Sequence, residues 1–133
     1  MEERLRQNVR ERAGNRCEYC RLRQEHEPFH PFHVEHVIAR QHRGTDEFEN
    51  LALACIICNL NKGPNLTGRD LDTDAVVRLF DPRVERWDDH FEIAGALILG
   101  RTPTGRTTAW LFRMNREERV ELRQILLDVG QWP

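Results

Sequence analysis

Lysine is nearly absent from this sequence, since Lys62 is the only one among 20 basic residues. Long apolar runs are absent as well, and none approaches the roughly 18 residues that a membrane-spanning helix needs. The first dozen residues are mostly charged and lack the apolar centre of a signal peptide, so export is not expected. These absences predict a cytoplasmic protein without a membrane partner.

A strong net charge is also missing. The formal net charge is −2 and the isoelectric point is near 6.3, whereas a domain that binds nucleic acid over its whole surface is usually strongly basic. Arginines nevertheless crowd the first two dozen residues: Arg4, Arg6, Arg10, Arg12, Arg16, Arg21 and Arg23. Those on the expected helix at 2–13 suit either phosphate contacts or a solvated helix face with Glu/Arg pairs, and the sequence leaves both interpretations open.

The length and composition suit one domain over residues 1–133, because 39% hydrophobic content allows a modest core. We predict a core at 17–63, an N-terminal helix at 2–13 and a supporting extension at 64–133. Leu5, Val9 and Ala13, spaced four residues apart, give that first helix its apolar stripe. The core is expected to contain a strand at 32–39, a partner strand at 51–54 and a short helix that ends at Gly63.

The extension has fewer signals. The patterns predict, in chain order, a polar loop at 65–74, a short apolar element at 75–80, a hairpin at 93–99, a helix from Pro103 to about Met114 and a last helix. Thr102 suits the N-cap before Pro103, and residues 115–118 resemble a capping box for the last helix. Trp87 and Phe91 are expected to pack in the core.

The four cysteines form two C-x-x-C pairs, Cys17/Cys20 and Cys55/Cys58. Zn²⁺ prefers tetrahedral thiolate ligands, and two such pairs supply four. Disulfides or redox chemistry are the alternative, which a cytosolic setting disfavours. Four cysteine ligands leave no open coordination position, so we predict a structural zinc.

Polar residues around the second pair suit phosphodiester hydrolysis. A histidine such as His36 can take a proton from water near neutral pH. Glu35 and Asn59 offer the oxygen ligands that Mg²⁺ or Mn²⁺ prefers, and Asn50 can hydrogen-bond across the preceding loop to fix the setting of His36. Neighbouring residues of a regular strand point to opposite faces, so Glu35 and His36 share a site only if the strand ends or bulges there.

Further candidates surround this set. His33 lies on the same side of the strand as Glu35 and is an additional candidate metal ligand. Arg40 and Arg43 flank the site and are candidate contacts to the scissile phosphate. Lys62 shares a helix face with Asn59 and suits either a phosphate contact or a solvated helix end.

The order C-x-x-C, E-H, N, C-x-x-C-N-x-x-K over residues 17–63 resembles the HNH endonucleases of the ββα-metal fold. The resemblance implies that His36 is the general base, that Glu35 and Asn59 bind the catalytic cation, and that Asn50 is the middle asparagine. Asn59 stands where the family name expects histidine, which argues against a catalytic zinc. A weaker similarity in the extension looks like the tail of small stand-alone bacterial members.

We therefore expect an α+β fold, in which a ββα-metal core is clamped by structural zinc, preceded by a helix and followed by an α/β extension. The expected function is a divalent-metal-dependent endonuclease that hydrolyses DNA, with duplex DNA as the expected partner. RNA stays open, because the chemistry takes place on the phosphate. The alternative is a non-catalytic zinc module that binds nucleic acid or protein.

Overall fold

The computed structural model describes residues 1–133, and its centre is a short hairpin with one helix. Strands β1 (His33–His36) and β2 (Leu51–Ala54) pair antiparallel, with His33 opposite Ala54 and His36 opposite Leu51. Helix α2 (Ile56–Lys62) follows Cys55 directly and packs on both strands. All four residues of β2 are buried. The predicted strand–strand–helix core is thus confirmed, although β1 is shorter than the expected 32–39.

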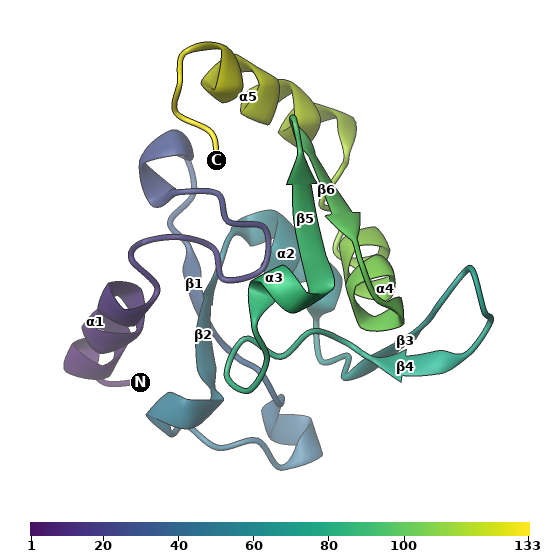
Figure 1. Ribbon diagram of the computed structural model, residues 1–133. Helices are drawn as coiled ribbons and strands as arrows, with labels where there is room; N and C mark the ends of the chain where they lie inside the picture. The colour runs from purple at the N-terminus through teal and green to yellow at the C-terminus, as the bar shows by residue number, and fades with distance from the viewer.

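Helix α1 (Glu3–Arg12) lies beside this hairpin (Figure 1). Val9 is its one buried residue, and Arg12 donates hydrogen bonds to the carbonyl oxygens of Phe48 and Leu51. The prediction of an N-terminal helix is confirmed within one residue at each end. Three single turns of 3-10 helix complete the first half: η1 (Gln24–His26), η2 (Arg40–His42) and η3 (Phe48–Asn50).

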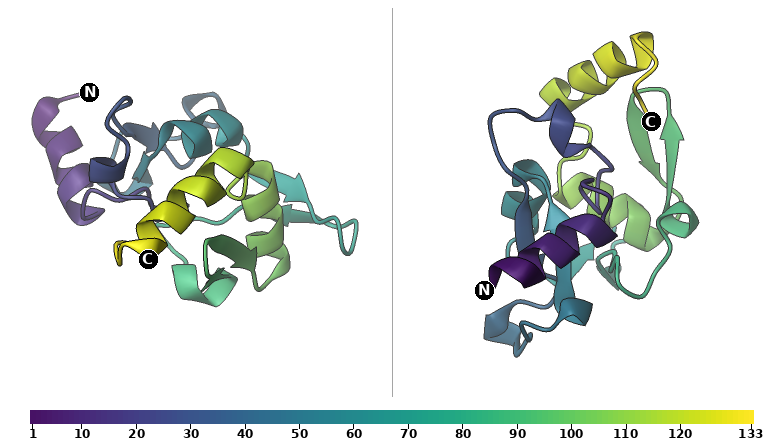
Figure 2. Two further views of the ribbon diagram at one scale, coloured as in Figure 1. Left: turned by 90° about the horizontal axis from the view of Figure 1, so that it is seen from above. Right: turned by 90° about the vertical axis from the view of Figure 1, so that its left-hand side faces the viewer.

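The extension adds two further hairpins and three helices, in the order β3 (Thr67–Arg69), β4 (Val76–Arg78), α3 (Trp87–His90), β5 (Phe91–Ala94), β6 (Leu97–Gly100), α4 (Pro103–Leu111) and α5 (Glu117–Asp128). The β3–β4 hairpin projects on the side away from α1 (Figures 1 and 2). The hairpin β5–β6 and the N-cap at Thr102, which accepts a hydrogen bond from the Gly105 N–H at 3.0 Å, match their predictions.

Two predictions for the extension are wrong. The supposed polar loop 65–74 contains β3, where Gly68 lies so close to α4 that an added Cβ would be 2.6 Å from a Thr107 methyl group. Contact with α4 therefore stabilises this strand, whose polar sequence has no pattern that predicts a strand. The supposed capping box is absent too, because the Asn115 side chain binds both backbone groups of Ile98 and leaves α5 without a side-chain cap.

One cluster of 23 buried hydrophobic residues joins these parts, running from Val9 to Trp132. Trp87 stacks on Phe91 with ring centroids 5.0 Å apart, and its indole N–H donates to the Tyr19 carbonyl oxygen at 2.7 Å. Tyr19 in turn packs edge-on against Phe112. The predicted packing roles of Trp87 and Phe91 are confirmed, and they tie the extension to the first cysteine pair. None of the helices is long and apolar enough to cross a membrane.

Candidate metal centre and catalytic site

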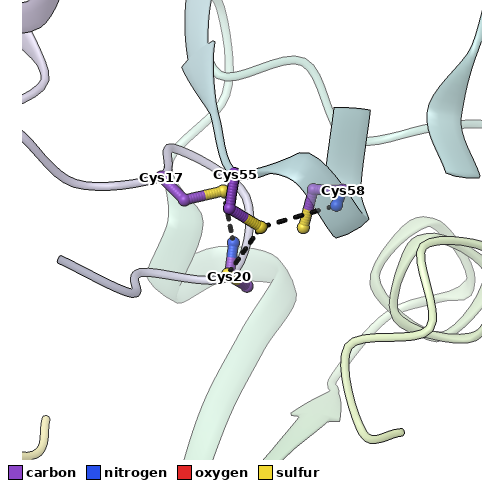
Figure 3. Close-up of side chains that lie close together, drawn as sticks. All are labelled: Cys17, Cys20, Cys55 and Cys58. Carbon is purple, nitrogen blue, oxygen red and sulfur yellow. Dashed lines mark hydrogen bonds between the residues drawn. The ribbon is translucent and has the colours of Figure 1, made fainter. Parts of the chain in front are cut away.

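Two loops bring the four cysteines into one buried cluster, in which their sulfur atoms lie within 4.8 Å of one another (Figure 3). No cysteine is in a disulfide, and the Cys20 and Cys55 sulfurs are 3.7 Å apart. Four sulfurs at the usual Zn–S bond length around a tetrahedral ion would be about 3.8 Å apart. The cluster therefore has the donor set and the spacing for a structural metal ion such as zinc.

Backbone hydrogen bonds shape each half of the cluster. The N–H groups of Cys20 and Cys58 each donate to the sulfur of the cysteine three residues earlier, at 3.5 Å. Cys55 is the N-cap of α2, so the second pair begins that helix. Glu18 and Leu53 exchange hydrogen bonds at 2.8 Å, which fixes the first pair along the outer edge of β2.

The thiols themselves favour a cation at this place. Burial raises the pKa of Cys17, and hydrogen bonds with the other three thiols raise the pKa of Cys58. The pKa of Cys55 is lowered, because the other thiols donate hydrogen bonds to it. A divalent cation would stabilise the thiolate forms of these buried sulfurs.

Glu35 points into the core toward α2. Its side chain is only 7% exposed; it accepts a hydrogen bond from the Tyr19 hydroxyl and lies 3.1 Å from the Lys62 ammonium nitrogen. Burial raises the pKa of Glu35, while Lys62 and Tyr19 oppose that shift. The Glu35 carboxylate is therefore already bonded to one ammonium group and one hydroxyl, and a metal ion at Glu35 would compete with both.

Lys62 is not a solvated helix end, because its side chain is buried. Its side chain is 3% exposed, and its ammonium also donates to the His36 carbonyl oxygen at 3.1 Å. Helix α2 begins beside the Ala54 end of the hairpin and returns along it, which brings Lys62 to the His36 end. The only lysine of the chain thus closes a buried ion pair.

His36 is the last residue of β1, and its side chain is 21% exposed. Its Nε2 lies 2.6 Å from Asp46 Oδ1, while Arg40 Nη2 lies 2.7 Å from the other oxygen of Asp46. Hydrogen bonds from His36 and Arg40 lower the pKa of Asp46, so this carboxylate is ionised at neutral pH. Because an ionised carboxylate only accepts hydrogen bonds, Nε2 carries the proton and Nδ1 is left without a partner.

Asn50 fastens the loop that carries Asp46. Its Oδ1 accepts from the Ile38 N–H at 2.9 Å, and its Nδ2 donates to the carbonyl oxygens of Ile38 and Thr45 at 3.0 and 2.8 Å. These three hydrogen bonds, here called the Asn50 clasp, require glycine at position 44, because a Cβ there would lie 1.6 Å from the Ile38 oxygen. The hydrogen bonding expected of Asn50 across the loop is therefore present.

Replacing Asn50 with aspartate is expected to destabilise the protein by about 2–4 kcal/mol in urea unfolding. The new carboxylate keeps one acceptor but sets two carbonyl oxygens, those of Ile38 and Thr45, against a negative charge. Asn65→Asp is the control, since Asn65 is exposed and its side chain makes no hydrogen bond. Equal losses in the two variants would contradict the clasp.

The other candidates lie apart from these contacts. Asn59 is half-buried on α2, and no protein group hydrogen-bonds to its carboxamide. His33 is exposed at the far end of β1, and Arg43 is exposed with a left-handed backbone, φ 70°. The register stays regular through His36, so no bulge turns Glu35 and His36 to one face. The Lys62 ammonium, bonded to the Glu35 carboxylate and the His36 carbonyl, is what links the two.

Sequence reasoning missed Asp46 and Tyr19. Asp46 sits ten residues after His36 in a polar stretch without a spacing pattern, so only the closed loop reveals the contact. Tyr19 lies inside the first C-x-x-C pair, where its hydroxyl gave no signal of a partner on β1.

The hairpin and helix, with a histidine at the strand end, form a ββα core of the α+β class beside a four-cysteine cluster that could hold a metal ion. Residues 17–65 match the family model of the HNH endonucleases. The match covers the two cysteine pairs and every residue that the sequence predicted to be catalytic. Searches of curated proteins and of solved structures gave no match.

Proposed function

We propose that this protein is a divalent-metal-dependent HNH endonuclease that hydrolyses DNA, with His36 as general base. One observation carries the proposal: within the matched segment, Asp46 holds His36 by Nε2 at 2.6 Å and leaves Nδ1 free on a partly exposed ring. A base needs this combination of a fixed ring, a defined tautomer and access for water.

The proposed reaction begins with a water molecule hydrogen-bonded to His36 Nδ1. His36 takes the proton as the water oxygen attacks phosphorus in line. The bond from phosphorus to the 3′ oxygen then breaks, and the departing oxygen takes a proton from solvent water, which leaves 5′-phosphate and 3′-hydroxyl ends. Asp46 stabilises the imidazolium that forms, because its carboxylate already accepts the Nε2 hydrogen.

Glu35 and Asn59 are the proposed ligands of the catalytic cation, since a carboxylate and a carboxamide suit Mg²⁺ or Mn²⁺. When bound, the cation supplies positive charge to the departing oxygen. Lys62 would have to give up the Glu35 carboxylate, and its ammonium would then be released toward the His36 end of β1. His33 is a further candidate ligand. Arg43 is the freer of the two flanking arginines for a phosphate, because Arg40 is held by Asp46.

A non-catalytic zinc module is the second candidate function. The buried pairing of Glu35 with Lys62 favours it, since this carboxylate is closed to solvent. The two candidates differ in one measurable respect, because a binding module needs no turnover and no second cation.

The direct experiment offers plasmid, single-stranded DNA and RNA to the protein, with and without Mg²⁺ or Mn²⁺. We expect cleavage only when a divalent cation is added, and on plasmid DNA. Zinc per chain is measured in the same samples, so that lost structural metal is not mistaken for lost activity. Binding of nucleic acid without cleavage under every cation would favour the non-catalytic module.

A further inference from the structure

Two arginines face each other beside the first cysteine pair. Arg16 and Arg23 pair across an isolated antiparallel bridge, so their side chains leave the backbone from adjacent positions. Hydrogen bonds on both sides of the bridge fix this arrangement, from Cys17 N–H to Leu22 at 2.8 Å and from Gln24 N–H to Asn15 at 2.9 Å. Like charges directly opposite one another on paired strands are destabilising, so local stability does not explain why two arginines are paired here.

A third guanidinium belongs to the same loop. Arg21 adopts a left-handed backbone, φ 71°, and stacks over the Trp87 ring at 4.8 Å. Two surface pockets share Arg16 as a common wall. One, of about 210 Å³, also contains Arg12 and Arg21, and the other, of about 420 Å³, also contains Arg23. Both are many times larger than the roughly 30 Å³ that a water molecule takes up in the liquid.

Nearby acids do not neutralise these arginines. Glu18 is taken by Arg83 and by the Leu53 N–H. Glu85 lies 2.8 Å from the His90 ring and also accepts from the Asp81 N–H.

Arg16 and Arg21 form no ion pair, and the one acid that reaches the group is the exposed Glu25, 3.6 Å from Arg23. Arg16 shares one pocket with Arg21 and the other with Arg23, and it bonds to no acidic side chain in either. A bound anion would relieve the repulsion among these arginines.

We propose that Arg16, Arg21 and Arg23 form a phosphate-binding site for the nucleic-acid backbone, separate from the scissile phosphate. Guanidinium groups match phosphate oxygens in paired hydrogen bonds, which makes arginine the suited residue. The inference rests on the proposed function, because it assigns the anion to the same substrate.

The position of the cluster supports a backbone rather than a free ion. Gln24, next to Arg23, accepts a hydrogen bond from the Phe32 N–H at 2.6 Å, which places the cluster near the His33 end of β1. His36 is at the other end of that strand, roughly 10 Å from His33 by strand rise. A phosphate held by the cluster and the scissile phosphate at His36 would therefore be different phosphates of one nucleic-acid chain.

The test measures binding of a short labelled DNA duplex by fluorescence anisotropy at several salt concentrations, without divalent cation and in the His36→Ala background. Arg16→Gln/Arg21→Gln is compared with Arg4→Gln/Arg6→Gln, which removes the same charge from exposed positions of α1 without ion pairs. We expect the first pair to weaken binding about tenfold at low salt. It should also reduce the slope of log K against log salt by about 1.8, as for two lost phosphate contacts.

Stability and a small anion complete the test. The thermal midpoint of the Arg16/Arg21 variant is expected to equal or exceed that of the parent, because charge repulsion among the arginines is removed. A lower midpoint together with unchanged DNA binding would mean that the cluster is structural, and it would overturn the proposal. Equal loss of binding in both double variants would assign the effect to overall charge instead. Inorganic phosphate could instead raise the thermal midpoint of the parent but not of the variant, while the substitutions leave duplex binding unchanged. That result would indicate a site for a free anion and overturn the proposal. If the parent binds no nucleic acid, the proposed function itself fails.

Discussion

His36→Ala is expected to slow DNA cleavage by about 10²–10⁴-fold, the usual contribution of a general base. His36 is half-buried and contacts Asp46 through one exposed hydrogen bond, so its loss should leave folding and DNA affinity close to those of the wild type. The rate is measured with plasmid under saturating Mg²⁺ or Mn²⁺, together with the thermal midpoint and the duplex affinity. A fall in rate without a fall in affinity assigns His36 to the chemical step.

Two further variants sharpen this result. Asp46→Asn keeps the shape of the side chain but weakens the hold on Nε2, so we expect a smaller fall of about 10–100-fold. His30→Ala is the matched control, because His30 is an exposed loop histidine paired only with Glu27. Cleavage by His36→Ala at the wild-type rate would remove His36 from the mechanism, whatever the outcome for Asp46.

The core of this fold was predictable because its signals are local. Two C-x-x-C pairs predict a metal site, the apolar run at 51–54 predicts a buried strand, and Thr102 before a proline predicts a helix start. Each signal spans a few residues and needs no knowledge of distant partners. The elements that depended on such patterns occur where they were expected, with strand and helix ends shifted by a few residues.

The errors share one physical cause, which is competition from distant partners. Asn115 has the sequence context of a helix cap, but the backbone groups of Ile98 take its side chain. Lys62 stands at a helix end that looks solvated, but α2 turns it onto a buried carboxylate. Burying an unpaired charge is costly, so the burial of Glu35 and that of Lys62 are each accounted for by the other residue. The sequence could not show this, because only the fold brings the two side chains together.

The buried sulfur cluster leads to the other large effect, which concerns folding. A structural zinc in a small domain supplies an apparent binding free energy of about 10–16 kcal/mol, whereas a whole domain is stable by only about 5–15 kcal/mol. In this chain the cluster joins the first loop to the start of α2, and the Glu35 and His36 positions depend on that helix through Lys62. The metal is therefore expected to decide whether the HNH segment folds at all.

Cys58→Ser should accordingly yield a protein that is largely unfolded and holds less than one zinc per chain, by circular dichroism and elemental analysis. Removing the metal from the wild type with a strong chelator should give the same spectrum, and added Zn²⁺ should restore the original one. Ala109→Ser is the control, because it adds a hydroxyl at another buried position and should cost only about 1–3 kcal/mol. A Cys58→Ser variant that melts cooperatively at the same temperature as Ala109→Ser would show that packing, and not the metal, holds α2 against the hairpin.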